Sequence, residues 1–148
     1  LGIALIRFKN GAYGLIEGTT NIYPKNLEET LYIFGEKGTV KGGGQSVNVI
    51  DEWVFSDALD DPEQVKRAHH ENPPNVYGFG HIPLYADMAR AIRDDREPYV
   101  SAEDGKRALE LVLAIYLSAA EGRPVRLPLS DCSTLDFAGR FERGDQDG

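Results

Sequence analysis

In the first third of the chain, apolar residues gather in short runs of the kind that form β-strands, whose alternate positions lie on opposite faces. The runs with this pattern cover residues 1–8, 13–22, 29–34, 39–41, 46–50 and 52–55. Asn10-Gly11 lies between the first two runs, and it predicts a type I′ hairpin turn because both residues tolerate positive φ angles. The pattern therefore predicts a mostly antiparallel meander of five or six strands with short connections.

The apolar spacing then changes to the three- and four-residue steps of amphipathic helices. A helix is predicted at about 81–94 from the apolar positions Ile82, Tyr85, Met88, Ala89 and Ile92. A second long helix is predicted at 103–121, between a capping-box start at Ser101 and a stop at Gly122. We therefore predict the α+β class: an open-faced, mostly antiparallel sheet with the two long helices packed on one face, as a two-layer sandwich.

Two shorter segments complete the prediction. Asp61-Pro62 predicts a short polar helix that continues to about Glu71, with Asp as the cap and Pro at the first position. Residues 124–128 predict a short final strand, and from Ser130 onward the sequence is too polar to pack as a regular element. We thus expect one domain over 1–129 and a polar, mobile tail over 130–148.

Composition and charge narrow the class of partner. The chain has 148 residues, of which 41% are hydrophobic and 27% charged, as in an ordinary globular domain. A net charge of −8 argues against nucleic acid or an anionic membrane surface as a partner. Cys132 is the single cysteine, and no apolar run is long enough to cross a bilayer, so we predict a cytoplasmic protein. Because the sequence opens without Met and directly in a strand pattern, we expect a piece of a longer protein.

Three polar motifs allow a structural or a functional interpretation. On the second strand run one face carries Leu15, Glu17, Thr19 and Asn21, which is either a wet ligand surface or simply the solvated face of a sheet. Residues 42–44 are three glycines, but no Lys-Ser or Lys-Thr follows them, which favours a flexible turn over a phosphate cradle. His69-His70-Glu71 suggests metal binding, yet adjacent helical residues point about 100° apart, which favours a solvated face.

His81 is the strongest candidate for a functional side chain. Gly78 and Gly80 allow a tight turn into the helix at 81–94, and Pro83 suits its first turn. That turn places His81 at the N-terminal mouth of the helix, where a neutral imidazole can donate or accept a hydrogen bond. The alternative is a histidine that caps or packs the helix.

The order and spacing of several motifs make the chain resemble the C-terminal domain of the Gfo/Idh/MocA oxidoreductases over about residues 1–129. The motifs are 17–20 (EGTT), 33–39 (IFGEKGT), Gly80-His81 with Asp87, Ala91-Ile92, Asp104-Gly105 with 108–110 (ALE), Ile115-Tyr116 with Ser118-Ala119, and 125–128 (VRLP).

The resemblance implies an NAD(P)-dependent enzyme acting on a sugar, cyclitol or nucleotide sugar. In that family a preceding Rossmann domain binds the cofactor and carries the catalytic lysine, and this sequence has neither the Gly-x-Gly-x-x-Gly loop nor Glu-Lys-Pro. We therefore expect no catalytic residue, dinucleotide site or metal site in this chain, and no turnover by the chain alone. NAD or NADP would belong to the longer protein.

The resemblance also implies a substrate site and an oligomer. The family residue six positions before the helix Asp, here His81 before Asp87, often reaches the sugar, although some relatives have Tyr there. We predict His81, Glu17, Thr19 and Asn21 as substrate-binding residues, with His81 orienting the sugar rather than acting as the base. Apolar residues on both faces of several strands predict a homodimer or tetramer through the sheet face. A stand-alone sugar-binding module and a purely oligomerising module remain the alternatives. The gene sequence upstream of Leu1 would distinguish the oxidoreductase from both, and calorimetry with sugar nucleotides would distinguish the two alternatives from each other.

Overall fold

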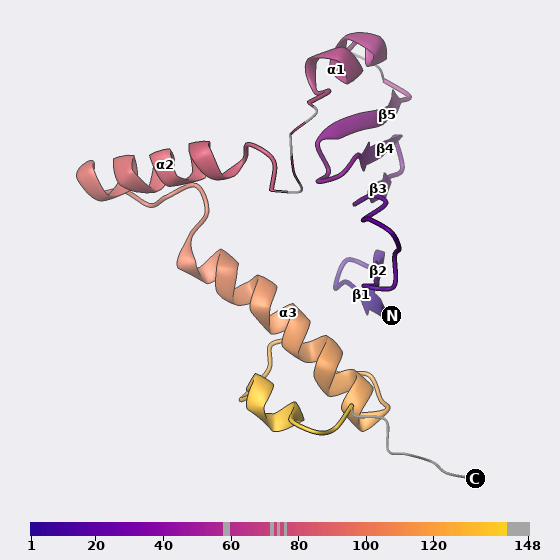
Figure 1. The fold of residues 1–148 in the computed structure, drawn as a ribbon, viewed down its shortest axis with the longest axis vertical. Helices are drawn as coiled ribbons and strands as arrows, with labels where there is room; N and C mark the ends of the chain where they lie inside the picture. The colour runs from indigo at the N-terminus through magenta and orange to yellow at the C-terminus, as the bar shows by residue number, and fades with distance from the viewer. Residues whose placement is uncertain (58–59, 72, 74, 76, 142–148) are drawn as a thin grey trace. The chain divides into compact units, whose positions relative to one another are not determined.

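The computed structural model describes residues 1–57, 60–71, 73, 75 and 77–141 (Figure 1). Its elements in chain order are β1 (Gly2–Arg7), β2 (Tyr13–Gly18), β3 (Leu31–Phe34), β4 (Gly38–Gly43), β5 (Val49–Phe55), α1 (Pro62–Ala68), α2 (His81–Arg93), α3 (Ala102–Glu121) and the 3₁₀ helix η1 (Thr134–Phe137). The chain divides into two compact units, Leu1–Ala89 and Arg90–Gly148. Antiparallel strands followed by helices confirm the predicted α+β class.

Strands β1 and β2 form an antiparallel hairpin whose turn differs from the predicted one. Arg7 pairs with Tyr13, which leaves five residues between the strands rather than two. The Gly11 N–H donates to the Phe8 carbonyl at 3.1 Å, and the Phe8 N–H donates to the Ala12 carbonyl at 2.9 Å. Gly11 has a φ of 91°, whereas Asn10 is not among the residues with positive φ. This is the bonding of a type I turn followed by a left-handed glycine bulge, so the type I′ prediction was wrong.

Strands β3, β4 and β5 form a second antiparallel sheet in that order. The two strands predicted at 46–50 and 52–55 are one strand, β5, with a register irregularity opposite Lys41 and Gly42. The glycine triplet is a turn only in part, because Gly42 and Gly43 are buried residues of β4 and Gly44, with a φ of 92°, begins the turn. A Cβ on Gly43 would lie 2.6 Å from the Asp51 carboxylate, so a larger residue there would require that side chain to move.

Helix α1 begins as predicted and ends earlier. The Asp61 carboxylate accepts from the Glu63 N–H at 3.0 Å, and Pro62 is the first helical residue. The helix ends at Ala68 rather than near Glu71 because the next residues pair with β5. The Ile50 N–H donates to the His69 carbonyl at 3.2 Å, and the Glu71 N–H donates to the Asn48 carbonyl at 3.1 Å.

The two long helices lie where the spacing predicted them. Helix α2 runs from His81 to Arg93, with Pro83 in its first turn. Helix α3 begins with the predicted capping box, in which Ser101 and Asp104 each accept from the other's backbone N–H. It ends at Gly122, whose φ of 63° is left-handed. Their packing against a sheet stays a prediction.

The segment after α3 corrects two predictions. Residues 124–128 form no strand, because Pro124 and Pro128 supply no N–H to a ladder and no described strand pairs with this segment. Residues beyond 130 were expected to form no regular element, yet η1 forms with its own capping box between Ser133 and Asp136. Phe137 in η1 is 7% exposed and stacks on Tyr116 of α3 at 5.7 Å between ring centroids. The predicted mobility of residues 142–148 concerns residues outside the described part of the chain.

Large apolar side chains are exposed on several elements. On the hairpin, Ile3, Leu5 and Leu15 are 63%, 73% and 69% exposed. Leu5 pairs with Leu15, and Ile3 lies two residues from Leu5 on the same strand, so the three side chains share one face of the β1–β2 sheet. No helix within the described residues is long and apolar enough to cross a membrane.

Candidate functional site

The chain turns into α2 through a tight loop that fixes the position of His81. The Tyr77 N–H donates to the Asn75 side-chain oxygen at 3.0 Å, and the Gly78 N–H donates to the Asn75 carbonyl at 3.3 Å. Gly78 has a φ of 61°, a left-handed value that favours glycine. His81 follows as the first residue of α2 and is exposed. The backbone therefore presents its imidazole at the N-terminal end of the helix.

Two tyrosine rings flank the His81 imidazole. The Tyr77 ring lies edge-on to it, with 6.4 Å between centroids and 68° between planes. The Tyr85 ring lies one helical turn further on, also at 6.4 Å, with 31° between planes. Tyr77 and Tyr85 are 73% and 70% exposed. We call Tyr77, His81 and Tyr85 the ring column.

The other three predicted site residues lie on or after β2. Glu17 is an exposed strand residue paired with Ile3. Thr19 and Asn21 lie beyond the end of β2 at Gly18, so the predicted strand face does not extend to them. The Thr19 hydroxyl instead accepts from the Asn21 N–H at 3.1 Å in a local turn. Among the described residues, no hydrogen bond or ion pair joins any of these three to His81.

A polar cluster occupies the irregular part of the β4–β5 ladder. The Lys41 ammonium lies 2.9 Å from the Asp51 carboxylate and 5.7 Å from the centre of the Tyr32 ring. The hydrogen bond to Asp51 raises the pKa of Lys41, against the opposing effect of burial. Lys66 of α1 lies 3.8 Å from Glu52 and 3.4 Å from Glu63. Each charge in the cluster thus has an opposite charge nearby.

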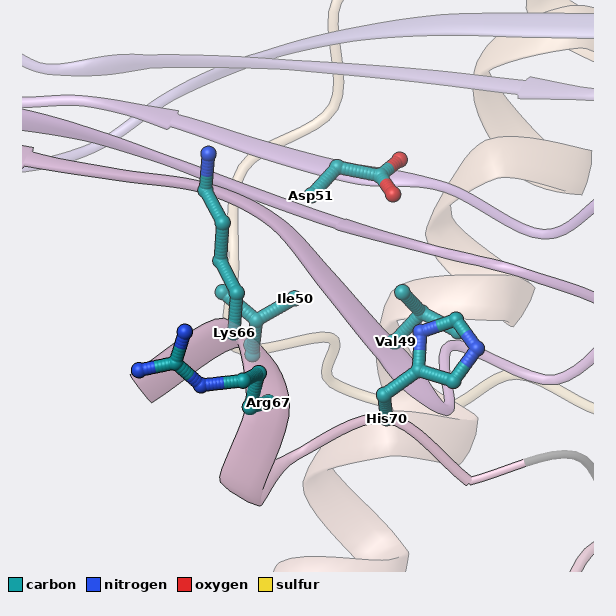
Figure 2. Close-up of a pocket in the computed structure, with 6 residues that line it drawn as sticks. All are labelled: Val49, Ile50, Asp51, Lys66, Arg67 and His70. Carbon is teal, nitrogen blue, oxygen red and sulfur yellow. The ribbon is translucent and has the colours of Figure 1, made fainter. Parts of the chain in front are cut away.

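A pocket of about 280 Å³ lies between α1 and β5, beside this cluster (Figure 2). Its lining residues are Val49, Ile50, Asp51, Lys66, Arg67 and His70. Figure 2 shows that the basic side chains of Lys66, Arg67 and His70 point in different directions rather than toward one centre. Asp51 and Lys66 are also engaged by other charges. We therefore place the candidate site at the ring column rather than in this pocket.

The histidine pair at 69–70 has a structural place. His69 caps the C-terminus of α1, and His70 forms an isolated antiparallel bridge with Val49 of β5. Within the described residues no group of three or more His, Cys, Asp or Glu is placed to hold a metal ion.

The sequence analysis predicted His81 as a site residue, assigned Tyr85 to the apolar stripe of the helix and did not consider Tyr77. A signal was present, because Tyr77, His81 and Tyr85 recur at intervals of four residues. All three side chains combine a ring with a polar hydrogen-bonding group, and His81 and Tyr85 lie one turn apart on α2.

The fold and sequence together define the class of protein. Residues 1–127 match the family model described as the oxidoreductase family, C-terminal alpha/beta domain, of the Gfo/Idh/MocA type. This match covers most of the 148 residues, so the chain belongs to that family. The predicted resemblance is thereby confirmed.

Two solved structures are similar to the chain. The first is the WlbA dehydrogenase from Bordetella pertussis in complex with NADH and UDP-GlcNAcA, with 40% identity and a TM-score of 0.74. The second is the WlbA dehydrogenase from Chromobacterium violaceum, in complex with the same two ligands, with 36% identity and a TM-score of 0.71. Each comparison covers 86% of this chain but only 36% and 34% of the respective dehydrogenase. No curated protein matches the chain.

Proposed function

We propose that this chain is the substrate-binding and oligomerising part of an NAD(P)-dependent dehydrogenase that acts on a nucleotide sugar. The observation that carries the proposal is the 40% identity to a dehydrogenase solved with NADH and UDP-GlcNAcA. The family match over residues 1–127 supports an oxidoreductase without indicating its substrate. UDP-GlcNAcA, or a nucleotide sugar with the same groups, is the substrate that this likeness favours. The cofactor would bind to a part of the protein outside this chain.

His81 is the residue to which we assign sugar orientation. Its exposure and its place at the start of α2 leave the imidazole nitrogens accessible to a hydroxyl group. Hydride transfer from a secondary alcohol requires the reacting C–H to be held in one orientation, and a hydrogen bond to a sugar hydroxyl contributes to that. Glu17, Thr19 and Asn21 are proposed to bind the substrate as well, although the structure brings none of them to His81 through a direct bond.

The oligomerising role is supported by the hairpin. Ile3, Leu5 and Leu15 are exposed apolar residues on one face of the β1–β2 sheet, which they share with Glu17, the partner of Ile3. Apolar surface of this kind is typical of interfaces, and one self-complementary patch covers both copies in a symmetric dimer. We propose a homodimer, or a tetramer built from such dimers, that forms through the sheet face.

The test of activity uses the full-length protein that contains this chain. With NAD or NADP present, UDP-GlcNAcA should give a steady rise of the reduced-nicotinamide absorbance, and UDP-GlcNAc should not. The 148-residue chain alone should give no rise with either. Absence of turnover and of substrate binding by the full-length protein would reject the enzyme and favour a purely oligomerising module.

A substitution tests the assignment of His81. His81→Ala should raise KM for the nucleotide sugar about tenfold, since loss of one hydrogen bond costs about 1–1.5 kcal/mol. The KM for the nicotinamide cofactor should stay unchanged. His69→Ala is the matched control, because it removes an exposed histidine side chain elsewhere in the same unit. Equal KM values for the substrate in wild type and His81→Ala would refute a role for His81 in binding.

A further inference from the structure

We propose that Tyr77 and Tyr85 are positioning residues of the same site, which restrict the orientation of the His81 imidazole and contact the sugar part of the substrate. The inference rests on the proposed function, because it adds two residues to the substrate site proposed above. Three observations carry it: the ring contacts, the exposure of all three side chains, and the difference between Tyr85 and its apolar neighbours on α2.

The ring contacts restrict how the imidazole can turn. His81 has two tyrosine rings at 6.4 Å, one from the loop before α2 and one from the next helical turn. Aromatic rings prefer edge-on and tilted arrangements of the kind seen here. An exposed histidine without such neighbours would sample several rotamers. The column therefore favours one orientation of the imidazole before any substrate arrives.

Both tyrosine rings remain open to a ligand. Tyr77 is 73% exposed and Tyr85 is 70% exposed, although each contacts His81. Neither hydroxyl forms a hydrogen bond within the described residues. The column thus presents two phenol hydroxyls and an imidazole in a row, with the faces of the aromatic rings beside them.

A sugar matches this arrangement chemically. A pyranose ring has hydroxyl groups on its edge and C–H bonds on its faces, so it pairs with residues that combine a polar tip and a flat apolar body. Tyrosine is such a residue, whereas the neighbouring Ile82 and Met88 offer only apolar surface. The alternative is that Tyr85 packs only as one more member of the apolar stripe of α2. Leucine at position 85 would satisfy that alternative equally well.

The test compares leucine and phenylalanine variants in the full-length enzyme. Tyr77→Leu and Tyr85→Leu remove the ring, and each should raise KM for UDP-GlcNAcA about fivefold or more while kcat changes less than twofold. Tyr77→Phe and Tyr85→Phe keep the ring, and their KM should return to within about threefold of wild type. Tyr23→Leu is the matched control, since Tyr23 is 93% exposed and outside the column.

The outcomes test the inference about the two tyrosines separately from the proposed function. Wild-type KM in both leucine variants would overturn the inference and leave the proposed function intact. An equal loss in the leucine and phenylalanine variants would overturn the role of the rings in positioning His81. Wild-type enzyme without activity toward nucleotide sugars would instead reject the proposed function. Because Tyr77 lies outside the helix, Tyr77→Leu remains informative even if Tyr85→Leu fails to fold, and circular dichroism identifies that case.

Discussion

At the scale of single residues, the Ser101–Asp104 box at the start of α3 couples helix stability to pH. The Asp104 carboxylate accepts from the Ser101 hydroxyl at 2.7 Å and from its N–H at 3.0 Å. These bonds favour the charged form and lower the pKa of Asp104 from its ordinary value of 3.8. Because the folded-state pKa is lowered, the stabilisation that these bonds give the folded chain is present above pH 3.8. It is lost as the pH falls through the folded-state pKa.

Ser101→Ala should therefore destabilise the chain in a pH-dependent way. At neutral pH the loss should be about 1 kcal/mol, the usual cost of removing a helix N-cap. As the pH falls below 3.8 and through the lower folded-state pKa, the difference from wild type should shrink, because protonation of Asp104 weakens its bonds to Ser101. Urea unfolding at several pH values measures this. Ser130→Ala, at an exposed serine outside any helix, should have little effect, and a pH-independent difference for Ser101→Ala would contradict the assignment.

Single residues also show where sequence reasoning succeeds. The capping box and Gly122 were predictable because their chemistry lies within a few consecutive residues. The site was predicted only in part, since His81 is marked by the adjacent Gly80 and by the helix that it begins. The contact of Tyr77 with His81 depends on how the loop turns into α2, and residue type alone does not determine that turn.

At the scale of elements, the sequence predicted the order of the five strands but neither their number nor their ends, because 46–50 and 52–55 are one strand and 124–128 is none. Asn10-Gly11 marks a turn correctly, yet its type depends on register, and the Arg7–Tyr13 pair leaves room for the longer loop. Residues 125–128 contain the apolar residues of a strand, but a strand also needs a partner, which the local pattern cannot reveal. The 3₁₀ helix η1 begins with the same Ser-x-x-Asp capping signal as α3, at Ser133 and Asp136. The sequence analysis missed this signal because the segment from Ser130 onward is polar overall.

Packing of η1 on α3 gives an element-scale prediction. Phe137 is buried between Tyr116 and Phe141, with ring centroids at 5.7 and 6.4 Å. Phe137→Ala should lower the free energy of unfolding by roughly 2–3 kcal/mol, below the usual range for a core phenylalanine because the neighbouring rings are partly exposed. Thermal or urea unfolding of the 148-residue chain measures the change.

Leu135 provides the matched control within the same element. It lies in η1 but is 81% exposed, so Leu135→Ala should change the stability by less than about 0.5 kcal/mol. Similar losses in both variants would indicate that η1 contributes through its backbone rather than through the Phe137 ring.

At the scale of the whole molecule, the exposed hairpin face predicts self-association. Leu5→Glu places a charge in the middle of the surface formed with Ile3 and Leu15, so it should shift a dimer toward monomer at micromolar concentration. Sedimentation velocity measures the state, and circular dichroism should show the secondary structure unchanged. Ala12→Glu adds the same charge in the hairpin loop and should leave the dimer intact. A wild-type chain that stays monomeric throughout this range would reject the interface.

The folded part of the chain extends past α3, beyond the last residue that matches the family model. The family match ends at residue 127, but the Leu129 N–H donates to the Glu110 side chain at 2.7 Å and Phe137 covers Tyr116. An ancestor without this segment would have left an aromatic ring of α3 in water. Tyr116 and the aromatic residues at 137 and 141 should therefore be gained and lost together in evolution, and relatives that end near residue 127 should carry a smaller or polar residue in place of Tyr116.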